Sequence, residues 1–238
     1  MKKTLTPLIS AILLLFVFVS LASAKPEVTE FRKDGFDLSQ IKTVLVMPVG
    51  YDVDIPASEP FLVESAEQRW EEQTLKKQDH FPYLLKSTKD VVERAAFVSG
   101  EPVGHMTQQQ LADKAYEVAA DQVDAILYCT VTKCSIDVLH HPGEYVTRYR
   151  VVDKPVWRND HWETHRVSVP YQEYKEPWDE DITHGAVKLE LYSAKDETLL
   201  YGESVDARTG EGLFSGAPSL TKHIQNVIEN AAKRIPVK

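Results

Sequence analysis

The residues of this chain best suited to chemistry are its histidines and acidic side chains. His161 and His165 stand four apart in His-Trp-Glu-Thr-His, a spacing at which two imidazoles on a helix can share one zinc ion. The flanking residues favour a strand instead, and on a strand the two rings share a face but lie about 13 Å apart. That is too far for one ion, so we predict solvent-facing histidines here and neither a metal site nor a cofactor.

Two further groups have the composition of a ligand site without its pattern. His140 and His141 lie in a turn, and only the folding of hairpins could bring them to His184. The acidic loop Trp178-Asp-Glu-Asp181 lacks the glycine and the alternating oxygen ligands of a calcium loop. We predict a solvated acidic loop and assign no catalytic residue.

Cys129 and Cys134 are the only two cysteines, and an exported chain would be expected to pair them. Five residues apart on one extended strand they would lie roughly 16 Å from each other, beyond disulfide reach. A sharp turn at Thr132-Lys133 would permit the bridge. We favour buried free thiols that pack as small apolar side chains, and the lack of a Cys-x-x-Cys spacing argues against redox catalysis.

The first 24 residues have the pattern of an export signal. Lys2 and Lys3 precede an apolar run from Leu8 to Leu21, and Ala22-Ser23-Ala24 resembles a cleavage site. The run is shorter than the ~18 to 20 residues that span a bilayer, and no cysteine follows it to carry a lipid. We expect cleavage near Ala24 and a mature protein in the periplasm or outside the cell, with no stable membrane anchor.

Charge and length limit the partners and the number of domains. Loss of the signal removes two lysines and leaves 25 basic side chains against 36 acidic ones, a net charge of −11 with histidine neutral. Such a surface repels phosphate backbones and anionic lipids, which disfavours nucleic acid and membrane-surface partners. The remaining residues suffice for one sizeable core. We predict a flexible segment over 25–40 and one α/β domain over 41–238.

A helix followed directly by a long strand, between Thr107 and Val138, organises that domain. Its first half repeats apolar residues with the 3.6-residue period of a buried helix face. Thr107 and Gln110 have the spacing of a capping box at its start. From Val123 onward the chain is β-branched and aromatic, which indicates a central strand. A helix that leads into a buried strand is half of a crossover unit, so the fold is α/β or α+β.

The rest of the chain supplies helices and strands around this unit. Helices are expected over Pro60–Gln78 and Ser219–Ile235, with a short helical segment over Lys89–Phe97. Strands are expected over Ile41–Val49 and around Val187–Leu191, where apolar and polar residues alternate. The predicted architecture is a single mixed β-sheet flanked by about three main helices, with a β-rich antiparallel insertion over about 144–180.

Aromatic side chains crowd the predicted insertion, with arginines among them. This composition is typical of a protein-binding surface or of a sugar-stacking groove. The alternative is that the aromatic residues are cross-strand pairs that hold a hairpin together. The candidate binding residues are Tyr145, Tyr149, Trp157, Trp162, Tyr171, Tyr174 and Trp178.

The order of the expected elements resembles a known envelope domain. Its signs are a first strand with Val-Met-Pro, a long strand that starts Val-Asp-Ala-Ile-Leu, and the turn Ser-Ala-Lys-Asp-Glu-Thr before a partner strand. It is similar to the small α/β domain of the TolB amino-terminal domain, the CsgG curli-secretion lipoprotein and LpoB-type activators of peptidoglycan synthases, and to uncharacterised exported bacterial proteins of that kind. The resemblance covers roughly Ile41 to Ile235. The chain departs from it by lacking a lipidated cysteine and by its insertion.

The resemblance implies a non-enzymatic adaptor that docks other proteins in the cell envelope. We therefore predict an exported, non-catalytic protein, an adaptor or assembly factor, whose partner is an envelope protein or a cell-wall component. The alternatives are a cell-wall glycan-binding module, or a secreted hydrolase or metal-dependent enzyme. An enzyme of that kind would need histidines and carboxylates gathered in a deep pocket.

Overall fold

The computed structural model describes residues 25–100, 104–158, 160–211 and 216–237, so the predicted signal segment lies outside the described residues. The chain divides into two compact units. The first, which we call the sheet unit, holds the described residues up to Asp137 and those from Ile182 onward. The second, the hairpin unit, is Val138–Asp181. The antiparallel insertion predicted over about 144–180 falls inside the hairpin unit.

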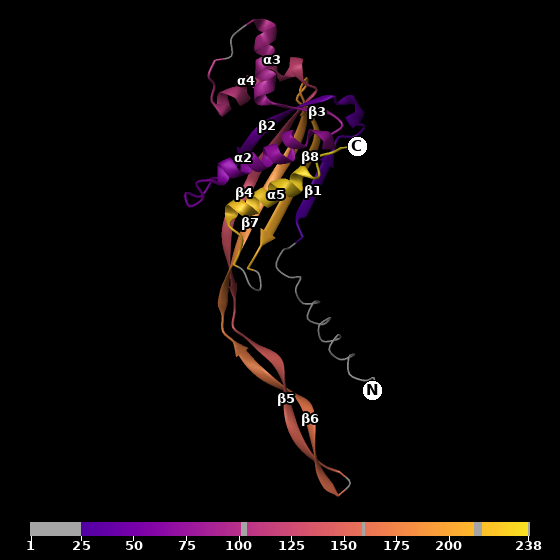
Figure 1. The fold of residues 1–238 in the computed structure, drawn as a ribbon, viewed down its shortest axis with the longest axis vertical. Coiled ribbons are helices and arrows are strands. Elements are labelled where there is room, and N and C mark those ends of the chain that lie inside the picture. Colours follow the sequence, from indigo (N-terminus) through magenta and orange to yellow (C-terminus); the bar gives the residue numbers. More distant parts are fainter. Residues whose placement is uncertain (1–24, 101–103, 159, 212–215, 238) are drawn as a thin grey trace, which may run out of the picture. The chain divides into compact units, whose positions relative to one another are not determined.

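The sheet unit is built on one mixed sheet of six strands (Figure 1). The strand order is β1-β8-β7-β4-β2-β3. Strand β2 runs parallel to both β3 and β4, whereas β8 runs antiparallel to β1 and β7. This confirms the predicted α/β class. The strands are β1 (Glu27–Arg32), β2 (Thr43–Tyr51), β3 (Leu84–Ser87), β4 (Ala125–His141), β7 (Trp178–Ser193) and β8 (Leu199–Thr209).

Helices cover both faces of the sheet because β2 is apolar on both sides. Val44 and Val46 belong to the cluster that includes α2 and α5, while Leu45 and Met47 belong to the cluster that includes α3 and α4. Among the described residues, none of the helices is both long and apolar enough to span a bilayer. The helices are α2 (Leu62–Gln73), α3 (Thr88–Ser99), α4 (Gln108–Gln122) and α5 (Leu220–Ala232), with 3₁₀ helices at Leu38–Gln40 and Leu75–His80.

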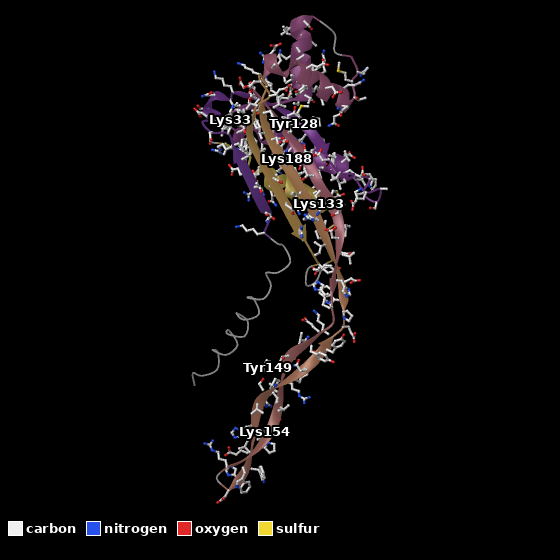
Figure 2. All side chains as sticks on the ribbon, turned by 180° about the vertical axis from the view of Figure 1, so that it is seen from behind. Lys33, Tyr128, Lys133, Tyr149, Lys154 and Lys188 are labelled. Carbon is white, nitrogen blue, oxygen red and sulfur yellow. The ribbon has the colours of Figure 1, made fainter. Side chains whose placement is uncertain are left out.

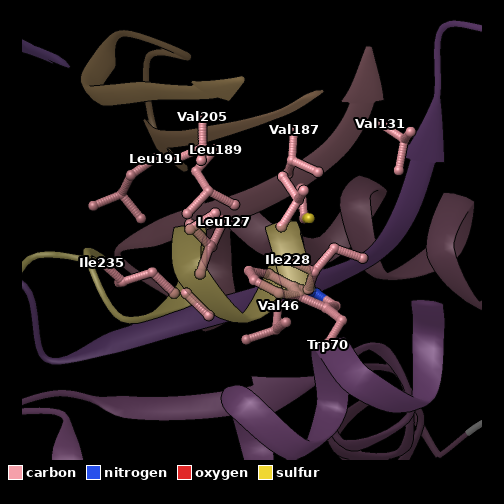
Figure 3. Close-up of a cluster of buried hydrophobic side chains, with 14 of the residues drawn as sticks. Val46, Trp70, Leu127, Val131, Val187, Leu189, Leu191, Val205, Ile228 and Ile235 are labelled. Carbon is pink, nitrogen blue, oxygen red and sulfur yellow. The ribbon is translucent and has the colours of Figure 1, made fainter. Parts of the chain in front are cut away.

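The larger apolar cluster lies between the sheet and helices α2 and α5. Figure 3 shows Trp70 of α2 beside Val46 and Ile228, with Leu127 and Leu189 from the strands above them. The Trp70 side chain is 1% exposed, and its Nε1 donates a hydrogen bond to the Met47 carbonyl at 2.9 Å. Each large apolar side chain buried here stabilises the fold by about 1.5 to 3 kcal/mol. The sheet unit therefore has a hydrophobic core of its own.

Helix α5 approaches the sheet closely at Gly185 of β7. A Cβ atom added there would lie 2.8 Å from Cδ1 of Ile224 and 3.0 Å from Cδ2 of His223. We expect Gly185→Ala to lower the free energy of unfolding by about 1 to 2 kcal/mol, because α5 must move away from the strand. Urea unfolding followed by circular dichroism measures the loss. Gly202→Ala is the matched control, since its Cβ would lie no closer than 3.7 Å to a neighbour. Equal losses at both glycines would contradict close approach as the cause.

The flexible segment predicted over 25–40 contains regular structure. Strand β1 pairs antiparallel with β8 from Glu27↔Asp206 to Arg32↔Tyr201, and Leu38 is buried. The prediction of a flexible segment is therefore wrong for β1 and for the part around Leu38. β1 is an edge strand whose side chains are nearly all exposed, so it carries little of the apolar alternation by which strands are recognised.

The two cysteines lie on the single strand β4 and are free and buried. This confirms the interpretation of both as buried thiols that pack as apolar side chains. Burial raises the pKa of the Cys134 thiol to about 11, and it raises the pKa of Cys129 as well. Both side chains are therefore protonated at neutral pH, and neither is an activated nucleophile.

Candidate functional site

The hairpin unit has no core. It contains the ends of β4 and β7 and a hairpin of two long strands, β5 (Glu144–Arg158) and β6 (His161–Lys175). No described residue from Val138 to Asp181 is buried. A two-stranded hairpin is marginally stable in water, so this unit exposes apolar surface that a self-sufficient domain would cover.

The register of the hairpin divides its side chains into two faces. The strands pair antiparallel along their whole length, from Glu144↔Lys175 to Arg158↔His161. Residues directly opposite each other project to the same side of a sheet, and successive residues project to opposite sides. One face therefore carries the odd-numbered residues of β5 and the even-numbered residues of β6. The other face carries the rest.

We call the first of these the aromatic face. Its seven cross-strand rows are Tyr145/Tyr174, Thr147/Gln172, Tyr149/Pro170, Val151/Ser168, Asp153/Arg166, Pro155/Thr164 and Trp157/Trp162. The only formal charges among these residues are those of Asp153 and Arg166, which pair with each other at 3.5 Å. The side chains of Tyr145, Tyr149, Trp157, Trp162 and Tyr174 are 73, 70, 54, 68 and 47% exposed. Figure 2 labels Tyr149 on β5.

Two ring pairs stand at the ends of the aromatic face. The rings of Tyr145 and Tyr174 lie 5.0 Å apart, and those of Trp157 and Trp162 meet edge to face at 5.2 Å. These contacts confirm that part of the aromatic content forms cross-strand pairs. Tyr149 lies opposite Pro170 and is not in either pair. Since every ring of the face is about half exposed or more, pairing within the hairpin does not account for all of this surface.

On the opposite face, which we call the charged face, many of the polar side chains contact one another within the hairpin. Arg148 forms an ion pair with Glu173, and the Arg150 guanidinium lies over the Tyr171 ring at 5.8 Å. Glu163 receives both His161 and His165, whose Nε2 atoms lie 3.0 and 3.1 Å from its two oxygens. Three valines of this face, Val146, Val152 and Val167, are half-buried, while Val156 and Val169 are 37 and 36% exposed. The charged face therefore exposes less apolar surface than the aromatic face, whose large rings are 47 to 73% exposed.

The structure thus separates the seven candidate aromatic residues. Five of them lie on the aromatic face. Tyr171 lies on the charged face, paired with Arg148 in the register. Trp178 belongs to β7, where its ring stacks on His141 with centroids 4.1 Å apart and the Lys175 ammonium lies 5.1 Å above it.

The remaining candidate groups form hydrogen-bonded pairs. His140 contacts Asp179 at 2.7 Å, and His141 contacts Glu180 at 2.8 Å. The predicted acidic loop is therefore the first part of strand β7, with acids that pair with histidines. Within the part of the chain that the structure describes, no three His, Cys, Asp or Glu side chains are arranged to hold a metal ion.

His184 is the one candidate histidine inside the core of the sheet unit. Its ring is 1% exposed, with Nε2 at 2.7 Å from Asp206 and Nδ1 at 3.6 Å from Asp137. His223 of α5 contacts the Ala207 carbonyl at 3.0 Å, and burial lowers the pKa of His223. The His223 ring therefore joins α5 to β8.

An open groove of about 1030 Å³ on the sheet unit is a second location with chemical character. It lies at the carboxyl end of β2 and is lined on one side by Tyr128 of β4. The strand order changes direction here, because β3 lies on one side of β2 and β4 on the other. Ligands bind at such points in many α/β sheets. Glu64, Glu67 and Glu71 of α2 line the groove together with Tyr51 and Tyr128. Its lining contains no histidine, cysteine, serine or lysine, so any acid, base or nucleophile in it would have to be one of the glutamates or tyrosines.

Glu67 is the most constrained acid of the groove. Its carboxylate accepts a hydrogen bond from the Val49 N–H at 2.8 Å, and burial raises its pKa. Sequence reasoning missed this groove, because a glutamate-rich helix face is usually a solvated one. The available signal was the spacing of three glutamates on one helix face, in the first helix after a strand whose last residues include Pro48 and Gly50.

Together the fold and the exposed face define an α/β protein with an aromatic hairpin unit. No family model matches the chain, and no curated protein matches it either. A PelC dodecamer structure from Paraburkholderia phytofirmans is 14% identical, covers 87% of this chain and 94% of that chain, and has a TM-score of 0.39. Lipoprotein GNA1162 from Neisseria meningitidis is 17% identical over 81% of this chain and 98% of its own, with a TM-score of 0.34.

A putative neuraminyllactose-binding hemagglutinin homolog from Helicobacter pylori is 10% identical, covers 82% of this chain and 86% of that chain, and has a TM-score of 0.37. These likenesses are remote. They say nothing about the activity or the partners of this chain.

Proposed function

We propose that this protein is an exported, non-catalytic protein of the cell envelope that binds another protein through the aromatic face of its hairpin unit. One observation carries the proposal. The aromatic face exposes five large rings and Val151 in a unit with no buried described residue. Exposed apolar patches of this kind mark interaction sites, and rigid aromatic side chains supply most of the energy at protein interfaces.

The proposal concerns the face of the hairpin and not its edges. Each strand contains a proline, Pro155 in β5 and Pro170 in β6. Proline has no N–H to donate and is found in sheets at edges, where it discourages the addition of another strand. Side-chain packing on the aromatic face is therefore the favoured mode of binding over extension of the sheet.

Two further features support a binding role over a histidine-dependent hydrolase. The groove at the end of β2 contains three glutamates but no histidine. The histidines of the hairpin unit contact carboxylates on its strands. We include in this proposal the resemblance to the TolB, CsgG and LpoB group, which implies a docking role in the envelope.

The test is site-specific photo-cross-linking in cells that produce the protein. A photoreactive amino acid replaces Tyr149 in one variant and Tyr171 in the other, because the two tyrosines lie on opposite faces of one hairpin. We expect a discrete protein adduct from position 149 and none from position 171. Equal labelling from both positions, no adduct from position 149, or an adduct with the mass of a glycan would each overturn the proposal.

A further inference from the structure

The aromatic face is nearly free of net charge, which restricts what can cover it. Its one acid and one base, Asp153 and Arg166, face each other across the hairpin and cancel. The whole chain carries a formal charge of −9, and this net negative charge lies outside the aromatic face. A basic partner would therefore be expected to bind other parts of the surface. An uncharged aromatic surface is best covered by another uncharged, apolar surface, since desolvating a charge against it would be costly.

The pattern of the aromatic face is symmetric about Val151. The ring pair Tyr145/Tyr174 stands six residues along β5 to one side of it, and the ring pair Trp157/Trp162 stands six residues to the other. A two-fold axis through the Val151 row would therefore place the tyrosine pair of one hairpin on the tryptophan pair of another. Aromatic rings gain about 0.5 to 1.5 kcal/mol from such contacts beyond their buried area.

The intermediate rows are compatible with this operation. The Tyr149 row lies two residues to one side of Val151, and the Asp153/Arg166 row lies two residues to the other. Face-to-face packing requires the axis to lie along the Val151 row, so Asp153 of one copy lies opposite Tyr149 of the next, and Arg166 lies opposite Pro170. Because Asp153 and Arg166 pair with each other at 3.5 Å, the operation places no unpaired charge against the aromatic surface. A surface that matches itself under a two-fold axis is what an isologous dimer requires.

We infer that the partner of the aromatic face is a second copy of this chain, packed face to face about the Val151 row; this inference rests on the proposed function. The five rings expose about 600 Å² per copy, taking roughly 200 Å² for a fully exposed aromatic side chain. Two copies would bury about 1,200 Å², above the ~1,000 Å² expected of a specific interface. Stacked in this way, the two twisted hairpins would lie ~10 Å apart.

The test uses the purified full-length mature chain and two single-cysteine probes. Val151→Cys places a thiol on the aromatic face at the axis, and Lys154→Cys places one on the charged face. The native cysteines are buried. A thiol cross-linker that spans ~10 Å should join two Val151→Cys chains and should not join two Lys154→Cys chains.

Sedimentation equilibrium supplies the quantitative arm. The double variant Tyr149→Ser, Val151→Ser should raise the dimer dissociation constant about tenfold or more, as removal of central interface residues does. Neither residue belongs to a ring pair, so the hairpin itself should persist. Tyr171→Ser is the matched control and should leave the constant unchanged. An unchanged constant in the double variant, or equal cross-linking of both cysteine variants, would overturn the inference.

The outcomes separate this inference from the proposed function. A monomeric chain whose position 149 cross-links in cells to a different protein would overturn the second copy and leave the protein-binding role intact. A monomeric chain that binds neutral phosphatidylcholine vesicles through the aromatic face would overturn both. So would a monomeric chain that gives no adduct from position 149 in cells.

Discussion

Trp70→Ala should lower the free energy of unfolding by about 4 kcal/mol, the largest stability effect we expect for a single residue. The indole is 1% exposed between the sheet and helix α5, so its removal leaves a cavity that the packed neighbours cannot fill. It also leaves the Met47 carbonyl without its hydrogen bond. That carbonyl lies where the pairing of β2 with β4 shifts register, between Val46 and Val49. The midpoint of urea unfolding, followed by far-ultraviolet circular dichroism, gives the measurement.

Two control variants separate packing from hydrogen bonding. Trp70→Phe keeps most of the ring but no donor, so it should lose about 1 to 3 kcal/mol, chiefly from the unpaired carbonyl. Trp157→Ala removes a half-exposed indole from the hairpin unit and should change the unfolding of the sheet unit by less than about 0.5 kcal/mol. A Trp70→Ala midpoint equal to that of Trp157→Ala would contradict the assignment of Trp70 to the core.

Elements with a strong local period could be predicted from the sequence. Thr107 caps α4 through a capping box with Gln110, as its spacing predicts. Val187, Leu189 and Leu191 are fully buried while Lys188 is exposed, so the alternation along β7 is confirmed. These features depend on neighbours three or four residues apart on a helix, or two apart on a strand. Short windows of sequence contain all that such patterns need.

The ends of elements were harder to predict. The stripe from Leu62 to Trp70 predicts one helix as far as Gln78, but α2 ends at Gln73 and a 3₁₀ helix follows from Leu75. The chain leaves α-helical geometry at Thr74, which is buried and whose hydroxyl donates to the Trp70 carbonyl. The local apolar period does not indicate that Thr74 is buried, so it cannot give the residue at which the helix ends.

The division of the hairpin into two faces needed the cross-strand register. The alternation along β5 was visible in the sequence, but which residues of β6 share a face with Tyr145 depends on the length of the connection. Strands that end at Arg158 and resume at His161 leave a two-residue connection, and Asp160 has a φ of 61°. An Asn-Asp pair at such a position is a turn signal. A two-residue turn at this Asn-Asp pair sets the register of the two strands, and that register places Tyr171 on the opposite face from Tyr149.

Arg234→Ala should destabilise the protein by about 3 kcal/mol near neutral pH, because it leaves a buried carboxylate without its counter-charge. The Glu203 side chain is 1% exposed, and its Oε1 lies 3.4 Å from Nε of Arg234. Its Oε2 accepts a hydrogen bond from the Tyr201 hydroxyl at 2.5 Å. Arg234 itself is about half exposed, so we place the effect at the lower end of the range for a broken buried pair.

The pH dependence of this loss has a definite sign. Burial raises the pKa of Glu203 above its ordinary value of 4.5, and the Tyr201 hydrogen bond and the Arg234 charge only partly offset that rise. Removal of Arg234 should raise the folded-state pKa further. A raised carboxyl pKa favours folding in acid, and that advantage is lost as the pH rises through the folded-state value. The deficit of Arg234→Ala should therefore be small at about pH 4.5 and grow toward about pH 8.

Glu203→Gln supplies the decisive comparison, since it keeps an acceptor for Tyr201 but removes the charge. In a double-mutant cycle, Arg234→Ala should cost far less in the Glu203→Gln background than in the native one, with a coupling of about 2 kcal/mol. The residual pH dependence of that cost should also disappear. Urea midpoints of the four proteins at several pH values measure both effects. An equal cost of Arg234→Ala in both backgrounds would show that Arg234 acts through the packing of its methylene groups and not through its charge.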